Sequence, residues 1–413
     1  MSSSSRIPAL DVLRGFAVMG ILWMNITGFA LPQSAYFNPA ASGFLSAGDI
    51  AFWAVSLIAI DGKMRALFAM LFGASVLLLI DREEMVGRDG RRTQTIRLAW
   101  LFAIGLAHYL LLWWGDILMI YAVVGIAAML FAGREPLALV KFAFLFFLLQ
   151  FLVSAAFIGS LYAWSNAAAA PGAAHDLRIG FHDFMASLTD PTSPAIVRET
   201  ALYRSDFGTI LAHKIADFPG QWLWGLPFTA LETLGFMLLG MAMLKGGFLT
   251  ARWQPDQYLR TARHCFLIGL PPMTMLAAWV IWRGFQPLPT FAVALLWSFP
   301  FRIPLAVGWA SLLLYLYLSA PKHPIFARIA AIGRLTLSNY LGTSLAMTSI
   351  FYGWGLGLFG SVRPAAFPLF VIGGAVLMLL WSKPYAARFA VGPAEWLWRT
   401  LTTGKAQKIR KSV

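Results

Sequence analysis

The stretch RIPALDVLRGFAVMGILWMNITGFAL, residues 6–31, is apolar enough to cross a lipid bilayer and yet carries Asp11, Arg14 and Asn25. An ionisable group in a spanning segment costs about 2.5–3.5 kcal/mol on insertion scales unless it finds a partner or water. Asp11 and Arg14 are three residues apart and share one helical face. Two interpretations stay open: an ion pair that fixes this helix in a bundle, or an arginine that binds an anion at the membrane surface, with Asn25 about 16 Å deeper.

The composition of the whole chain agrees with a membrane location. Of the 413 residues, 59% are hydrophobic and 12% are charged, with a mean hydropathy of +0.70. Such a chain has too little polar surface for a soluble globule of this size. The net charge of +14 does not indicate nucleic acid, because the basic residues lie in short loops between apolar runs. The single cysteine, Cys265, excludes an intrachain disulfide.

Apolar runs of spanning length recur along the chain and predict an all-α, polytopic bundle of about ten transmembrane helices. A further apolar piece, 48–60, is shorter than the roughly 20 residues that a full crossing needs, and we expect it to lie on the outer side. The ten predicted spans are 7–31, 62–81, 94–114, 115–132, 137–163, 220–244, 258–282, 293–319, 330–352 and 364–383.

The basic residues set the orientation of these spans. With 48–60 outside, most of the 32 basic residues fall in segments that face the cytoplasm. Counting 48–60 as a span would instead place the cluster Arg82 to Arg92 outside, against the positive-inside rule. We therefore predict that both termini are cytoplasmic.

The chain 1–413 is predicted to form one membrane domain with two appendages. The polar insertion 164–219 is external in this topology, and it is either a helical cap over the bundle or a disordered loop. The segment 384–413 is interpreted as a basic cytoplasmic tail that contacts anionic lipid. The apolar side of the insertion comprises Leu202, Phe207, Ile210, Leu211 and Ile215.

Charged residues open the second predicted span. Asp61, Lys63 and Arg65 occur there, on its outer side. Asp61 and Arg65 are four residues apart, and a simple ion pair would account for both of them. Lys63 is then left without a partner.

A histidine and a carboxylate flank the turn between the third and fourth spans. His108 lies in the outer half of the third span and Asp116 begins the fourth. A lone buried histidine is commonly a hydrogen-bonded core residue. A carboxylate just across a short hairpin would instead orient the imidazole and tune its proton affinity, as in acid–base catalysis.

Three further spans contain polar residues. Glu232 and Arg302 are deep enough to need partners, and the simplest arrangement pairs them with each other. Thr336, Asn339 and Thr343 form one stripe, of a kind that commonly joins helices. The six histidines are scattered and no His/Cys cluster has ligand spacing, so the sequence predicts no metal site.

Six segments in order resemble the YeiB-like family of bacterial membrane proteins, known as domain of unknown function 418. The resemblance covers nearly the whole chain and implies an inner-membrane protein related to the transmembrane acyltransferase superfamily. Members of that superfamily pass an acyl group from cytoplasmic acyl-CoA to an acceptor at the far face, through about ten helices. The segments are LDVLRGFAVMGILWMNI, DGKMRALFAMLFG, GLAHYLLLWWGDILMIYAVVG, IGRLTLSNYLGTS, FYGWGLGLFG and GPAEWLWRTLT.

The O-acetyltransferase branch of the related superfamily carries an arginine, ten residues and then a histidine in its first helix. Here Arg14 is followed by ten residues and then Asn25, and an amide cannot act as a general base. If the chain is an acyltransferase, His108 must take that role with Asp116 orienting it. Asn25 would donate to the carbonyl oxygen.

The leading hypothesis is therefore an acyl-CoA-dependent transferase, with acetyl-CoA as the expected cosubstrate, that modifies a sugar or lipid of the cell envelope. The alternatives are a transporter of small molecules or lipids, and a scaffold protein without chemistry. Partners beyond membrane lipids are the acceptor and a second copy of the chain in a homo-oligomer. The residues expected to bind CoA phosphates are Arg14, Arg97, His323 and Arg334. Those expected to bind the acceptor, or a transported substrate, are Lys63, Arg65, Glu232, Arg302 and Asn339.

Overall fold

The computed structural model describes residues 7–410, so Arg6, at the start of the first quoted stretch, and the last three residues of the basic tail lie outside it. The described chain is helical and contains no β-strand. Its longer helices are α1 (Pro8–Ala30), α4 (Lys63–Met85), α5 (Gly90–Leu111), α6 (Leu118–Met129), α7 (Pro136–Ala169), α8 (His175–Thr189), α10 (Phe207–Lys245), α11 (Pro255–Trp282), α13 (Phe299–Ser319), α15 (Thr336–Phe351) and α16 (Phe367–Arg388). The shorter ones are α2 (Ser34–Phe37), η1 (Pro39–Ser42), α3 (Ala47–Val55), η2 (Ser56–Ile60), α9 (Pro194–Tyr203), α12 (Pro287–Ala292), η3 (Val293–Trp297), α14 (Pro324–Arg334), η4 (Pro364–Ala366) and α17 (Pro393–Thr403).

Eight helical segments in the described chain are long and apolar enough to cross a membrane. The protein is thus a helical membrane protein, as the composition predicts. The expected number of ten differs because two predicted spans form short helices. α6 has 12 residues and α15 has 16, both below the roughly 20 that a straight crossing needs.

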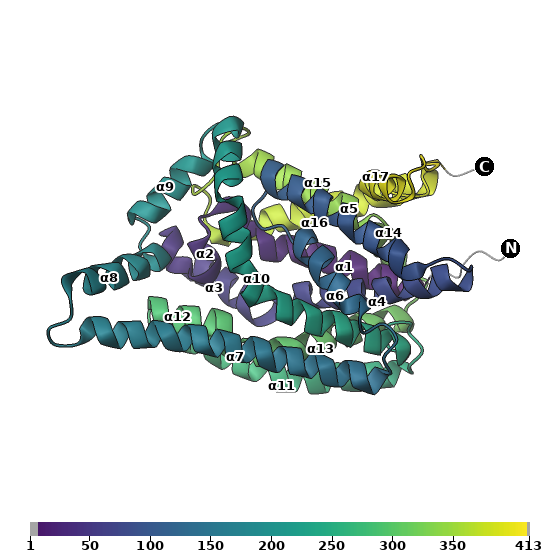
Figure 1. The fold of residues 1–413 in the computed structure, drawn as a ribbon, viewed down its shortest axis with the longest axis horizontal. Coiled ribbons are helices and arrows are strands. Elements are labelled where there is room, and N and C mark those ends of the chain that lie inside the picture. The colour runs from purple at the N-terminus through teal and green to yellow at the C-terminus, as the bar shows by residue number, and fades with distance from the viewer. Residues whose placement is uncertain (1–6, 411–413) are drawn as a thin grey trace.

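The two chain ends lie at one end of the molecule, and α8 and α9 lie at the opposite end (Figure 1). We call these the terminal end and the cap end.

The piece 48–60 is not a separate crossing, because α3, η2 and α4 form one 39-residue apolar segment, Ala47–Met85. A break at Asp61 and Gly62, where Gly62 has φ of +73°, interrupts it. Asp61 and Arg65 therefore lie in the middle of this segment rather than at its start.

Helix α1 is the centre of the bundle, and 72% of its most apolar window is buried. Two glycines let α1 and α14 touch backbone to backbone. A Cβ at Gly15 would lie 2.0 Å from the Ile329 carbonyl oxygen, and one at Gly333 would lie 1.8 Å from that of Asp11. Small residues permit such close approach between membrane helices.

The insertion 164–219 is helical and forms a cap. It comprises the end of α7, then α8 and α9, and the start of α10. The Ser34 hydroxyl donates to the carbonyl of Ser187 at 2.7 Å, and the Gly353 amide donates to that of Tyr203 at 2.8 Å. The cap is therefore bonded to the loops that follow α1 and α15.

Helix α10 is bent. Its first part crosses the long axis of the molecule, and its second part runs along that axis beside α7 (Figure 1). Pro219 and Pro227 lie inside this helix, and each removes a backbone hydrogen bond and favours a kink. The second part is fixed against α4, because a Cβ at Gly240 would lie 1.9 Å from the Met70 carbonyl oxygen. We call residues 207–228 the arm of α10.

Candidate functional site

Two cavities lie in the bundle, and Tyr121 of α6 lines both of them. The first has a volume of about 240 Å³ and is lined by three arginines, so we call it the arginine cavity. The second has a volume of about 400 Å³ and contains both acidic and basic side chains, so we call it the mixed-charge cavity. The hydroxyl of Tyr121 donates to the Arg65 carbonyl at 3.0 Å and is fixed at the boundary between them.

Arg14, Arg97 and Arg334 are brought together in the wall of the arginine cavity from α1, α5 and α14. The Arg14 guanidinium pairs with Asp11 at 3.3 Å and donates to the Ser75 hydroxyl at 2.6 Å. The predicted pair within α1 is therefore present. Because the Arg14 side chain remains 25% exposed, it is also accessible from the cavity.

The fourth residue of the predicted CoA site, His323, does not line this cavity. It precedes α14, and its Nδ1 accepts a hydrogen bond from the Ile325 amide at 3.3 Å, which makes it an N-terminal cap. The side chain is exposed. The location of His323 near the end of a predicted span therefore did not indicate whether its side chain lines the cavity.

Part of the predicted basic tail forms a wall of the arginine cavity. Glu395 and Trp398 of α17 both line it. The Glu395 carboxylate accepts from the Leu337 amide at 2.7 Å and from the Ser338 hydroxyl at 2.5 Å. Burial raises the pKa of this carboxyl. Helix α17 is thus docked on the N-terminus of α15, whereas the sequence predicts a basic tail that contacts anionic lipid.

An acidic residue between two arginines forms the charged part of the mixed-charge cavity. Glu232 is 3% exposed, and its carboxylate lies 2.9 Å from Arg65 and 3.7 Å from Arg302. The pairing predicted for Glu232 and Arg302 is present, with Arg65 added to it. The simple Asp61–Arg65 pair is not formed, because Asp61 instead accepts from the Tyr36 hydroxyl at 3.0 Å.

Lys63 is fully buried behind this cavity and does not line it. Its Nζ donates to the Leu57 carbonyl at 2.5 Å. Asn25, in contrast, lines the cavity, so its amide is within reach of a molecule bound there.

His108 and Asp116 form the predicted pair. Nδ1 of His108 lies 2.8 Å from Oδ1 of Asp116, and the two side chains are 1% and 0% exposed. The other carboxylate oxygen accepts from the Met119 amide at 2.8 Å. Nε2 of His108 is buried and has no hydrogen-bond partner in the described residues.

The pair lies at the boundary between the two cavities. His108 itself lines neither, whereas Asp116 lines the mixed-charge cavity. Tyr340 lines the arginine cavity, and its ring centre is 5.0 Å from that of His108. Its hydroxyl accepts from the Ile117 amide at 3.3 Å. Tyr121 and Tyr340 thus separate the cavities, a role that no sequence signal marks because both lie in ordinary apolar runs.

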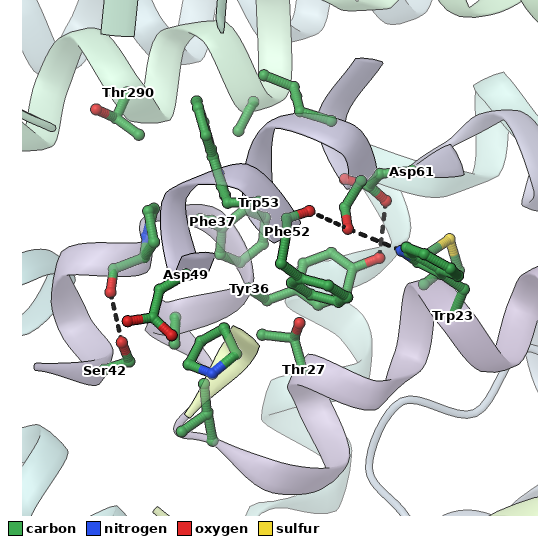
Figure 2. A pocket seen from close by; sticks show the side chains of 18 of the residues that line it. Trp23, Thr27, Tyr36, Phe37, Ser42, Asp49, Phe52, Trp53, Asp61 and Thr290 are labelled. Carbon is green, nitrogen blue, oxygen red and sulfur yellow. Dashed lines mark hydrogen bonds between the residues drawn. The ribbon is translucent and has the colours of Figure 1, made fainter. Parts of the chain in front are cut away.

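A smaller pocket of about 50 Å³ adjoins the mixed-charge cavity and shares Tyr36 and Asp61 with it. Figure 2 shows the Tyr36–Asp61 hydrogen bond beside Trp23, with Thr290 on the opposite side. The Thr290 hydroxyl is buried without a partner in the described residues. The pocket extends the polar surface of the larger cavity toward α3.

Asn339, a predicted acceptor-binding residue, lies in neither cavity. It lines a groove of about 390 Å³ between α15 and α16. Its Oδ1 accepts from the Trp381 indole at 2.9 Å, and its Nδ2 donates to the Ile332 carbonyl at 3.2 Å. These bonds join helices, which is the structural role that the polar stripe also allows.

Residues 243–405 match the family described as "Protein of unknown function (DUF418)". Over 399 residues the chain is 32% identical to the uncharacterized protein YeiB of Escherichia coli (strain K12), and the match covers 95% of each chain. Over 419 residues it is 28% identical to the uncharacterized protein YxaH of Bacillus subtilis (strain 168), a match that covers 99% of this chain and 97% of that protein.

Proposed function

The chain belongs to the YeiB-like DUF418 family, and we propose that it is a membrane-embedded acyltransferase that moves an acyl group from acyl-CoA to an acceptor in the mixed-charge cavity. One observation carries the proposal. Two cavities of different chemistry share Tyr121, and the His108–Asp116 pair lies at their boundary. A transferase whose two substrates approach from opposite sides needs this arrangement.

The arginine cavity is the site for acyl-CoA. Three guanidinium groups suit the phosphates of this cosubstrate, because an arginine fork matches phosphate oxygens in geometry and charge. The cavity lies toward the terminal end of the bundle, which is the cytoplasmic end in the predicted orientation. The pantetheine arm then extends toward Tyr121 and presents its thioester at the boundary. Acetyl is the acyl group that we expect.

The proposed acyl transfer moves one acyl group and one proton, and it involves no oxidation or reduction. A hydroxyl or amine of the acceptor attacks the thioester carbonyl, a C–O or C–N bond forms, and the C–S bond breaks. Nε2 of His108 takes the acceptor proton and passes it to the CoA thiolate, so that free CoA thiol is released. Asp116 holds Nδ1 of the imidazole protonated, as a carboxylate does in catalytic triads.

The remaining residues position the reactants. The Asn25 amide donates to the oxyanion that develops on the thioester carbonyl, since Asn25 lines the cavity. Arg65, Arg302 and Glu232 bind polar groups of the acceptor. Access to the His108 ring requires a small displacement of the Tyr340 ring, whose centre lies 5.0 Å away.

His108→Gln tests the proposal, because glutamine can keep a hydrogen bond to Asp116 but cannot accept the proton. We expect turnover of acetyl-CoA, measured as free thiol released by purified protein with membrane extract as acceptor, to fall by about 10²–10⁴-fold. The matched control is His213→Gln, since His213 is half exposed in α10 near the cap. Full turnover by His108→Gln would remove this residue from the mechanism.

A transporter remains the second candidate, favoured by the buried Glu232 between two arginines. The two functions differ in their need for CoA. Specific binding of CoA to the wild type, lost in Arg97→Ala, supports the transferase. A transporter has no reason to bind CoA, and flux of a substrate without CoA would support it instead.

A further inference from the structure

We propose that the acceptor is a membrane lipid amphiphile, bound with its polar head at the charged part of the mixed-charge cavity and its hydrocarbon chain beneath the arm of α10. That the bound molecule is the acceptor rests on the proposed function. That an amphiphile binds here rests on the lining of the cavity alone. The cavity is lined by charged and by apolar side chains, and the arm that forms part of its wall also carries exposed apolar side chains.

Along the face that α10 presents to the cavity, mainly apolar side chains are followed by the charged Glu232. The polar exception at the arm is Gln221, whose Oε1 accepts from the Tyr109 hydroxyl at 2.7 Å. Trp222, Leu226, Thr229 and Glu232 recur at four, three and three residues, so they lie on one side. The distance from Trp222 to Glu232 along a helix is about 15 Å. Hydrocarbon is thus favoured at the arm, and a polar head group is favoured at Glu232.

Helix α7, which packs against α10, repeats this change on the adjacent wall. Gln150, Ser154 and Phe157 recur at four and three residues and all line the cavity. Because α7 and α10 run antiparallel, Phe157 is placed beside Phe228 of the arm, and their ring centres are 4.9 Å apart. Gln150 is placed beside Glu232, whose amide donates to Oε1 of Gln150 at 3.3 Å. On both helices, the polar side chains lie at the end near Glu232 and the aromatic side chains lie at the end near the arm.

Part of the cavity lining is aliphatic, from Leu226, Leu295 and Ile120. Sugars bind aromatic faces and polar side chains, whereas aliphatic side chains offer them no hydrogen bonds. A free, water-soluble sugar would leave this part of the cavity unfilled. A hydrocarbon chain fills it and gains from the removal of apolar surface from water.

The arm is one helix thick between the cavity and the membrane. Trp222 lines the cavity, whereas the adjacent Leu223 and Trp224 are 57% and 73% exposed. Large exposed apolar side chains on a membrane protein face lipid or its interface. A lipid that reaches the cavity therefore has only the arm to pass.

The part of the arm between its two prolines has open space beside its glycines. A Cβ at Gly220 or at Gly225 would meet nothing within 4 Å, in contrast to Gly240 in the second part of α10. Pro219 and Pro227 interrupt the backbone hydrogen bonds on either side of this segment. The arm thus has the space and the weakened backbone to move aside for a chain.

The test uses the full-length protein in lipid nanodiscs and a dodecyl glucoside with a photoreactive diazirine in its alkyl chain. We expect labelled peptides from α7 at Gln150–Phe157 and from α10 at Gln221–Thr229. Gly225 lines the cavity and Gly220 does not, so the same substitution at each gives a matched pair. Gly225→Trp should lower this labelling by about tenfold, while Gly220→Trp leaves it unchanged. Leu226→Ser, which adds no bulk, is a second variant and should lower it by about threefold.

The outcomes separate this inference from the proposed function. Equal labelling of all variants, or competition by free glucose as effective as by unlabelled dodecyl glucoside, overturns the amphiphile site. Labelling as expected together with full acetyl-CoA turnover by His108→Gln overturns the proposed mechanism and leaves the amphiphile site supported. Labelling requires no CoA, so failure to bind CoA does not affect it.

Discussion

The indole of Trp398 donates its Nε1–H to the backbone carbonyl of Arg97 at 2.7 Å, and the Arg97 guanidinium lies 4.2 Å from the centre of the same indole. One side chain of α17 thus binds both the backbone and the charge of one residue of α5. The consequence is that the arginine cavity is closed by a helix that lies outside the spanning segments and comes from the far end of the chain.

Trp398→Ala should loosen α17, because it removes a hydrogen bond and a cation–π contact worth together about 1.5–3 kcal/mol. Hydrogen exchange of residues 393–403 should accelerate, and CoA should dissociate faster. Trp398→Phe keeps an aromatic face for Arg97 but loses the donor, so its effect should be intermediate. Equal exchange in all three proteins would mean that Glu395 alone holds the helix.

Arg14→Ala should weaken the binding of CoA by about 10–100-fold, because a charge-assisted bond to phosphate is lost. The affinity of the wild type should also fall steeply with salt. The control is His323→Ala, since His323 is exposed outside the cavity. Titration calorimetry with CoA measures both variants, and unchanged affinity in Arg14→Ala would leave Arg14 with a structural role, which includes its contacts with Asp11 and Ser75.

Glu232→Gln should lower the free energy of unfolding by about 3–5 kcal/mol, because it leaves Arg65 and Arg302 without their shared carboxylate. Adding Arg302→Met should restore part of the loss, since one uncompensated charge is removed. Thermal unfolding in detergent, followed by tryptophan fluorescence, measures both variants. A single variant as stable as the wild type would show that water already solvates this cluster.

Burial raises the pKa of Glu199 in the cap to about 7, while a hydrogen bond from the Gln33 amide at 2.9 Å opposes the rise. The folded pKa therefore lies above the usual value of 4.5. The protonated cap is the more stable one, and its stability falls as the pH rises from about 4.5 to 7 and then levels off. The loss is at most about 3 kcal/mol.

Glu199→Gln should abolish this dependence, because glutamine accepts the same bond without a charge. Proteolysis of the cap, measured between pH 5 and pH 8, should then be independent of pH after correction for the protease itself. A wild type whose cap is equally resistant at both ends of this range would contradict the prediction.

Cysteine labelling tests the predicted orientation. In a Cys265→Ser background, a cysteine at position 88 should react only after the membrane is permeabilised, whereas one at position 191 in the cap should react from outside. Position 88 lies beside α5 toward the terminal end, and position 191 lies between α8 and α9. Reaction of position 88 with an impermeant reagent would reverse the orientation.

Much of the bundle could be predicted from the sequence because hydrocarbon length and backbone hydrogen bonding leave few solutions. The His108–Asp116 pair was also predictable, since a tight turn limits how far apart two flanking side chains can lie. The short distance in sequence between Asp61 and Arg65 led to a wrong prediction that they pair with each other. Asp61 instead bonds to Tyr36, and Arg65 pairs with Glu232 of a distant helix. Pairing between distant helices has no local signal.

The roles of Tyr121, Trp398 and the arm of α10 could not be predicted for related reasons. A tyrosine in an apolar run looks the same whether it faces lipid or separates two cavities. Trp398 lies in a short polar helix whose docking depends on Glu395 reaching the start of α15. The bend of α10 depends on Pro219 and Pro227. Proline also occurs in loops, so these two residues alone do not predict a bent helix.

The glycine contacts between α1 and α14 affect how this protein is made. At about 5–20 residues per second, the roughly 300 residues from the end of α1 to the end of α14 take about 15–60 s to synthesise. During that interval the first helix, with Asp11 and Asn25, has been released by the ribosome but lacks its closest neighbour. A chaperone or the insertion machinery must shelter it, and chains truncated before Gly333 should be degraded rather than accumulate.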